Sequence, residues 1–414
     1  MNFTFLSELS ERNKKILAVA GFVLSVAAIG TALYLIFFSA PSAELPPATA
    51  TIGGAGTLPT VTGGARQPIT PTEETGLPKA DVVARGGLTQ ITAVTDSTAK
   101  LLAMGEGGQK INFYNPADKK FYSVGADGSA IELSDQKFPN VQSATWNSAG
   151  EKAILEFPDD SNIVYDFAAE KQITLPKHWT DFQFSPLRDE FIAKSLALDP
   201  NNRWLVMSSA DGSNVRAFQP LGQNENKVTV SWSPNDQIVA FADTADSIVG
   251  GGLSRKMILP VGKNGENLKG LIVEGLDFRP LWAPDGKQLL YSVVSDYSNR
   301  KPLLWASDAE PATMGENRRS LGVNTWADKC VFASKSKLYC AVPVGLPDNA
   351  GLQRVMFQDL PDNLYQIDLN SGVTSLTAVP EVETTMNNLT ITEDGTMLYF
   401  LNAKTGKMER LRLK

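Results

Sequence analysis

One short pattern recurs along most of this chain and limits what the chain can fold into. It consists of an aromatic residue, a small residue that is often followed by Pro, a polar turn, and a strand of alternating apolar residues. VSWSPNDQIVAFA and PLWAPDGKQLLYSV are clear copies. The anchor residues of the copies lie 38 to 59 residues apart and are Trp146, Phe184, Trp232, Trp282, Phe332 and, in a weaker copy, Ile391. A period of roughly 40 to 50 residues is typical of one four-stranded blade of a β-propeller.

The chain after Arg85 reads as short strands separated by Gly, Asn, Asp, Ser and Pro clusters, without a convincing amphipathic helix. Each copy of the pattern precedes a second hairpin, and Ile111–Leu133 supplies a further unit whose opening strand is expected at Lys100–Met104. We therefore predict an all-β fold, a seven-bladed β-propeller over residues 88–414, with six or eight blades also possible. The last unit runs out of chain after three strands, so Leu88–Ile91 could complete it and close the ring.

The W-S-P and W-A-P motifs at Trp232 and Trp282, with a variant at Phe184, resemble the repeats of TolB-like and dipeptidyl-peptidase-type propellers. The resemblance covers about Leu88–Lys414 as an architecture, and the motif itself is specific at three or four blades. It implies a propeller with a binding role, and it transfers no catalytic residue to this chain. TolB differs as a whole, because it is a soluble periplasmic protein with six blades and an additional N-terminal domain. The overall layout looks more like that of bacterial membrane-anchored propellers.

Large aromatic side chains are suited to the space where the inner strands of neighbouring blades pack together. We expect the blade-motif aromatics to fill that space as core residues instead of forming a ligand cage. They are Trp146, Phe184, Trp232, Trp282 and Phe332.

The N-terminal region contains an uncharged, almost wholly apolar stretch from Ile16 to Phe38. As a helix it would span about 34 Å, which is enough for a bilayer core of roughly 30 Å. This predicts a transmembrane helix; a cleaved signal peptide is the alternative, but the sequence after the stretch is a poor cleavage site. Three basic residues precede the stretch and none follows until Arg66, so residues 1–15 are expected to be cytoplasmic and the propeller outside the cytoplasmic membrane.

Small residues recur at spacings of three and four within the predicted span, at Ala18, Gly21, Ser25, Ala28 and Ala32. They could form a homodimer through the Gly21 and Ser25 face, although a lone anchor is also compatible with this composition. Residues 39–87 are rich in Pro, Gly and Thr, and we predict that they form a disordered extracytoplasmic linker.

The two cysteines, Cys330 and Cys340, flank a hairpin centred on Lys335. In that register they face one another at a separation that permits a disulfide. Because an extracytoplasmic location allows oxidation, a structural disulfide is favoured over two free thiols.

The search for chemistry yields no catalytic residue, cofactor site or metal site. A net charge of −7 argues against nucleic-acid binding. The lone histidine, His178, excludes a multi-His metal site and is expected in a turn. A dipeptidyl-peptidase-type hydrolase would need a G-x-S-x-G motif, which the sequence lacks. An enzyme that uses carboxylates around the channel, such as a lactonase or a glycan-acting propeller, remains an alternative.

Two long loops, Asp243–Ser254 and Pro343–Asn363, fall between the second and third strands of their units and are expected on one face. Long excursions in a fold with tight turns often carry function. We predict that the longer loop contacts a partner through Asp348, Arg354, Met356, Phe357 and Asp359. The partner would be an envelope protein, a peptide or a glycan, and the acidic loops favour a basic one. A structural subunit of an envelope complex is the third possibility.

Overall fold

A computed structural model describes residues 23–31, 79–105, 108–246, 248 and 255–414. The chain divides into two units, Met1–Glu73 and Glu74–Lys414. In the first unit, residues 23–31 are helical. The remainder of the predicted span, which includes Gly21, lies outside the described residues, as do linker residues 39–78. No helix within the described ranges is long and apolar enough to cross a membrane.

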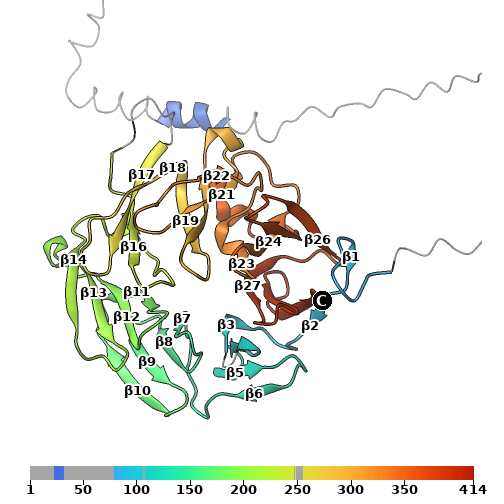
Figure 1. Ribbon diagram of the computed structural model, residues 1–414, viewed down its shortest axis with the longest axis horizontal. Helices are drawn as coiled ribbons and strands as arrows, with labels where there is room; N and C mark the ends of the chain where they lie inside the picture. Colours follow the sequence, from blue (N-terminus) through green and yellow to red (C-terminus); the bar gives the residue numbers. More distant parts are fainter. Residues whose placement is uncertain (1–22, 32–78, 106–107, 247, 249–254) are drawn as a thin grey trace, which may run out of the picture. The chain divides into compact units, whose positions relative to one another are not determined.

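The second unit is a seven-bladed propeller, as the repeat predicts (Figure 1). The strands of blades 1 to 3 are β3 (Lys100–Met104), β4 (Ile111–Asn115), β5 (Lys120–Val124) and β6 (Ala130–Glu132); β7 (Ser143–Trp146), β8 (Lys152–Glu156), β9 (Asn162–Asp166) and β10 (Lys171–Leu175); and β11 (Trp179–Phe184), β12 (Glu190–Ser195), β13 (Trp204–Ser209) and β14 (Arg216–Pro220). Each of these three blades is an antiparallel sheet whose strands pair in sequence order.

Blades 4 to 7 repeat this arrangement. Their strands are β15 (Val228–Val230), β16 (Ile238–Ala242), β17 (Arg255–Gly262) and β18 (Leu271–Glu274); β19 (Leu276–Trp282), β20 (Gln288–Val294), β21 (Pro302–Asp308) and β22 (Arg319–Ser320); β23 (Cys330–Phe332), β24 (Lys337–Pro343), β25 (Asp362–Asp368) and β26 (Thr374–Pro380); and β27 (Met386–Ile391), β28 (Met397–Asn402) and β29 (Met408–Arg412). The first strands, such as β3, β7 and β11, lie nearest the centre, and the fourth strands lie at the rim (Figure 1).

Short 3₁₀ helices occupy several connections between the strands. They are η3 (Pro200–Asn202), η4 (Glu225–Lys227), η5 (Asp296–Ser298), η6 (Ala327–Lys329), η7 (Ala350–Leu352) and η8 (Arg354–Phe357). Because successive strands of a blade alternate in direction, connections between second and third strands share one face with the connections between blades. Helices η5, η6, η7 and η8 therefore lie on the same face.

The ring is closed by Thr92–Ala93. The sequence analysis expected Leu88–Ile91 to complete the last blade, and this was wrong. Strand β2 (Thr92–Ala93) pairs antiparallel with β29 and completes blade 7. Strand β1 (Leu88–Thr89) instead adds a fifth, parallel strand to blade 6, with Leu88 opposite Val379. Because Leu88 and Thr89 already pair with β26, the edge strand β29 of blade 7 pairs with Thr92 and Ala93, which follow them in the chain. The propeller was predicted to begin at Leu88. Contacts with it begin at Asp81, whose amide donates a hydrogen bond to the Leu88 carbonyl.

The cores lie largely between adjacent blades. Trp282 of blade 5 stacks on Phe241 of blade 4 with ring centroids 5.5 Å apart. Trp146 of blade 2 meets Phe121 of blade 1 edge to face, at 5.6 Å. Trp232 and Phe184 are buried, whereas Trp146, Trp282 and Phe332 are partly buried, each against the apolar cluster at its own blade junction. The motif aromatics thus pack where one blade meets the next, which fixes the positions of the surface loops.

Candidate functional site

The longest described connection within a blade joins β24 to β25, between the second and third strands of blade 6. We call this segment, Val344–Pro361, the blade-6 loop. It contains η7 and η8 and corresponds to the longer loop predicted from the sequence. It is a structured element of the propeller surface.

The blade-6 loop has a small core of its own beneath it. Trp326, which directly precedes η6, is buried with Leu346 and Ala350 of the loop. Phe357 and Leu360 pack against the same cluster. Of the predicted contact residues, Phe357 therefore supports the loop. Trp326 was missed by the sequence analysis because it lies outside the recurring motif.

Arg354 fastens the loop to η6. Its Nη1 donates a 2.7 Å hydrogen bond to Oδ2 of Asp328, and its guanidinium lies 5.0 Å from the centroid of the Trp326 ring. Asp328 also lies 3.7 Å from Nη1 of Arg279, whose Nε donates to Asp277 at 2.9 Å. Burial opposes the charge of Arg279, but its hydrogen bond and attraction to the carboxylates raise its pKa above the ordinary value. A line of paired charges thus connects the loop to the inner strand β19.

The loop is also bonded to blade 5, next to η5. The amides of Asn349 and Gly351 donate to the carbonyls of Asn299 and Arg300, both at 2.9 Å. Lys301 Nζ lies 3.2 Å from Oδ1 of Asp348. A side chain at position 351 would begin 2.8 Å from the Arg300 carbonyl oxygen, so the approach of the two loops requires glycine there.

Large apolar side chains project into solvent from these two bonded loops. The exposed fractions are 52% for Leu352, 77% for Val355, 72% for Met356 and 79% for Tyr297. We call these four residues the apolar patch. Exposed apolar side chains that are grouped on an ordered element are typical of interaction sites. Met356 was predicted as a contact residue, whereas the other three were not.

A cavity of about 500 Å³ opens at the foot of the blade-6 loop. It lies between blades 5 and 6, and its walls combine apolar and polar side chains. The residues that define its character are Lys301, Leu321, Asn324, Val342, Leu346 and Tyr365. Its size and mixed lining suit a single large side chain of a partner.

The acidic character predicted for the two loops needs a correction at Asp362. This residue belongs to β25 and is buried, where its Oδ2 accepts hydrogen bonds from Lys329 Nζ at 2.7 Å and from the Met386 amide at 2.8 Å. Burial raises the pKa of Asp362, and Lys329 opposes that shift. In the other loop, Asp243 pairs with Lys256 at 2.9 Å, while residues 247 and 249–254 lie outside the described residues.

The structure joins Cys330 to Cys340 in a disulfide across β23 and β24. The strand register places the two residues directly opposite one another. Both are buried, and β23 begins immediately after η6. The bond therefore braces the segment that carries Asp328.

Carboxylates on the inner strands are paired with cations. Asp181 on β11 lies 2.6 Å from Lys194, and Asp277 on β19 lies 2.9 Å from Arg279. His178 is exposed in the connection before β11. In the described part of the chain, no three His, Cys, Asp or Glu residues are grouped so that they could hold a metal ion.

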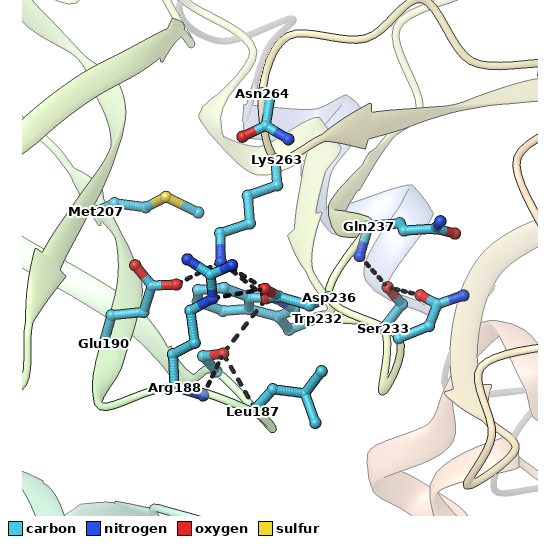
Figure 2. Close-up of polar contacts among 12 residues, drawn as sticks. Leu187, Arg188, Glu190, Met207, Trp232, Ser233, Asp236, Gln237, Lys263 and Asn264 are labelled. Atoms are coloured by element: carbon cyan, nitrogen blue, oxygen red, sulfur yellow. Dashed lines mark hydrogen bonds and ion pairs between the residues drawn. The ribbon is translucent and has the colours of Figure 1, made fainter.

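The motif turn of blade 4 serves packing (Figure 2). Trp232 Nε1 donates to Asp236 at 2.8 Å, and Lys263 Nζ lies 2.7 Å from Oδ2 of the same carboxylate. Lys263 also bonds Glu190 of blade 3 and lies 5.1 Å from the centroid of the Trp232 ring. The cluster joins two blades and leaves Lys263 buried.

No family model and no curated protein sequence matches this chain. Among solved structures, it is similar to the β-propeller domain of Cps50 (Swd1) from Myceliophteria thermophila, at 9% identity with a TM-score of 0.52, over 78% of this chain and 100% of that chain. It is also similar to oligogalacturonate lyase from Vibrio parahaemolyticus, at 10% identity with a TM-score of 0.54, over 78% and 93% of the two chains. At such identities the similarity establishes the propeller fold alone.

Proposed function

We propose that this protein is a membrane-anchored binding module that displays its propeller outside the cytoplasmic membrane and recognises a protein partner through the blade-6 loop. The observation that carries the proposal is the apolar patch. Leu352, Val355 and Met356 stay exposed on a loop that is held by a buried Trp, an ion pair and hydrogen bonds to blade 5. Ordering of the loop before binding lowers the entropic cost of association.

The anchor rests on the sequence of Ile16–Phe38 and on the excess of basic residues before it. With residues 1–15 inside, the linker and the propeller would be periplasmic or extracellular. The TolB-like character of the Trp232 and Trp282 motifs is compatible with a role in the cell envelope. Pairing of two anchors through the Gly21 and Ser25 face remains a prediction.

An enzyme that uses channel carboxylates receives less support from the geometry. A general acid or base has to exchange a proton freely with its substrate. Asp181 and Asp277 are instead each held within 3 Å of a cation. These pairs stabilise the inner strands, and we favour recognition over catalysis for this face.

Crosslinking in intact membranes tests the proposal. Full-length protein is compared with a variant in which Leu352, Val355 and Met356 are changed to Ser. A matched control changes Leu187, Val215 and Val373, which are also exposed but lie in connections on the opposite face, to Ser. We expect the first variant to lose the crosslinked partner at least tenfold and the control to retain it, because removing two or three anchors from a protein interface typically costs more than 1.4 kcal/mol.

Equal crosslinking by all three proteins would refute recognition through the blade-6 loop. The membrane orientation is checked in the same cells with a protease added from outside. Digestion of the propeller with protection of residues 1–15 is the expected pattern, and protection of the propeller would contradict the predicted topology.

A further inference from the structure

In two of the ion pairs around the apolar patch the carboxylate faces outward, whereas in a third pair, between Arg300 and Asp296, both members are equally exposed. In the ion pair between Lys301 and Asp348, the exposed fractions of the side chains are 26% and 60%; in the pair between Arg354 and Asp328 they are 27% and 49%. In both pairs the cation is the more buried member. Solvent and any partner therefore meet mainly the anionic side of each pair.

Asp359 adds to this anionic surface. It is exposed on the blade-6 loop, and it forms no ion pair with any other described residue. Glu381 and Glu383 follow β26 on the same face and are exposed as well. Nearby cations are already engaged in ion pairs: Arg279, Arg354 and Lys301 in those described above, Arg300 with Asp296, and Lys404 with Glu383. We call the charged residues around the apolar patch its rim. The rim consequently has little positive charge that is not already paired.

We propose that the occupant of this surface is a basic amphipathic segment of a partner protein, with apolar side chains that cover Val355 and Met356 and Lys or Arg side chains that meet Asp328, Asp348 and Asp359. The inference rests on the proposed function, and it specifies the class of partner. One large apolar side chain of the segment enters the cavity at the foot of the loop, next to Leu346 and Tyr365. Complementary charge around an apolar anchor provides both orientation and a rapid encounter.

Other occupants fit the surface less well. A second copy of this chain would place carboxylates opposite carboxylates in a symmetric contact, which is destabilising. An anionic bilayer surface would be repelled by the same rim. The flexible side chain of Met356 is well suited to adapt to apolar side chains of varied shape. A protein segment is the occupant that satisfies both the apolar and the anionic features.

Immobilised synthetic peptides provide the probe. The first peptide is an amphipathic sequence of Leu and Lys, the second replaces every Lys by Glu, and the third replaces every Leu by Ser. Binding of the full-length protein is measured at low and high salt. The variants are V355S/M356S and the matched control V215S/V373S, which keeps the overall charge and removes two exposed apolar side chains from connections on the opposite face.

We expect the Leu and Lys peptide to bind the wild type and the control alike, and the V355S/M356S variant at least tenfold more weakly. Binding should weaken with salt, and the Glu and Ser peptides should bind at least tenfold more weakly than the first. Equal binding of the Glu peptide, or equal binding by V355S/M356S, would overturn the proposed partner class. So would self-association of the wild type that V355S/M356S abolishes.

The two proposals fail in different ways. If crosslinking in membranes depends on the apolar patch while the peptides show no preference for Lys, the loop binds a partner of another class. If crosslinking is unchanged by the patch variant, recognition through the loop itself is wrong.

Discussion

Lys263 illustrates how a single side chain in this propeller connects two blades. It is buried between Glu190 of blade 3 and Asp236 of blade 4, and it lies over the ring of the motif residue Trp232 (Figure 2). Arg188 also approaches Asp236, at 3.3 Å, but from an exposed position. The ammonium group of Lys263 is thus the main compensation for two carboxylates at the blade junction.

We predict that Lys263→Met lowers the free energy of unfolding by about 3–5 kcal/mol, because removal of one member of a buried ion pair leaves an uncompensated charge. Urea denaturation of the variant and the wild type measures the difference. Lys269→Met is the control, since the pair of Lys269 with Glu316 is exposed and should contribute about 1 kcal/mol or less. Equal effects of the two substitutions would show that the Lys263 cluster does not stabilise the junction.

At the scale of single residues, the packing of a side chain could be predicted from the sequence where the residue belongs to the repeated motif. Trp232 and Trp282 recur with similar neighbours, so their packing between blades follows from the pattern. Trp326 and Lys263 do not belong to a repeated pattern, and their burial depends on segments that are distant in sequence. Asp362 has the same difficulty: as a carboxylate beside a loop it looks exposed, and only the fold places Lys329 against it.

At the scale of elements, the hairpin β23–β24 connects a disulfide to the support of the blade-6 loop. Its residues Cys330 and Cys340 are opposite one another and joined in a disulfide. The hairpin also places η6, with Asp328 at its centre, beneath the blade-6 loop. The stability of the hairpin is therefore linked to the support of the proposed recognition surface.

We predict that reduction of the disulfide lowers the free energy of unfolding by about 2–3 kcal/mol, the value expected when a closed loop of this length gains chain entropy in the unfolded state. Denaturation with and without a thiol reductant measures the change. A variant with both cysteines replaced by Ser should be insensitive to the reductant. If the wild type is equally insensitive, the bond either is not formed or does not stabilise the fold.

Element boundaries were predictable where a turn signal is strong. The opening strand Lys100–Met104 and the segment between β24 and β25 were placed correctly because polar turns delimit them. The closing strand was misplaced by a few residues, from Leu88–Ile91 to Thr92–Ala93. Short strands carry little alternation, and their register is set by the edge that they meet, which the local sequence does not encode.

At the scale of the whole molecule, the number of blades follows from counting repeats, because each repeat builds one sheet and the sheets must close. The recognition surface does not follow in the same way. Its apolar patch depends on hydrogen bonds between loops of two neighbouring blades, which the amides of Asn349 and Gly351 donate. Exposure of Val355 and Met356 is a result of that packing. The length of the loop led to the prediction of Met356 as a contact residue, but the sequence alone does not distinguish it from Phe357, which packs inward.

The ring is closed by the segment from Asp81 to Ala93, which bonds to both blade 6 and blade 7. Besides the β2 pairing, backbone hydrogen bonds link Ala84 to Arg412, Gly86 to Thr377, Val379 to Gly87 and Glu381 to Thr89. At about 1 kcal/mol each, these four bonds alone stabilise the closed ring by about 4 kcal/mol. Ala84 is also buried in the cluster beside blade 7.

We predict that a chain beginning at Val94 is less stable by about 4 kcal/mol or more than a chain beginning at Lys79, because it lacks these bonds and exposes the edges of β26 and β29. Thermal unfolding compares the two chains, and size-exclusion chromatography detects association through the exposed edges. Since the chain from Lys79 retains every described closing contact, it controls for loss of the residues before it. Equal stability and an equally monomeric state would mean that the three remaining strands of blade 7 close the ring without the N-terminal segment.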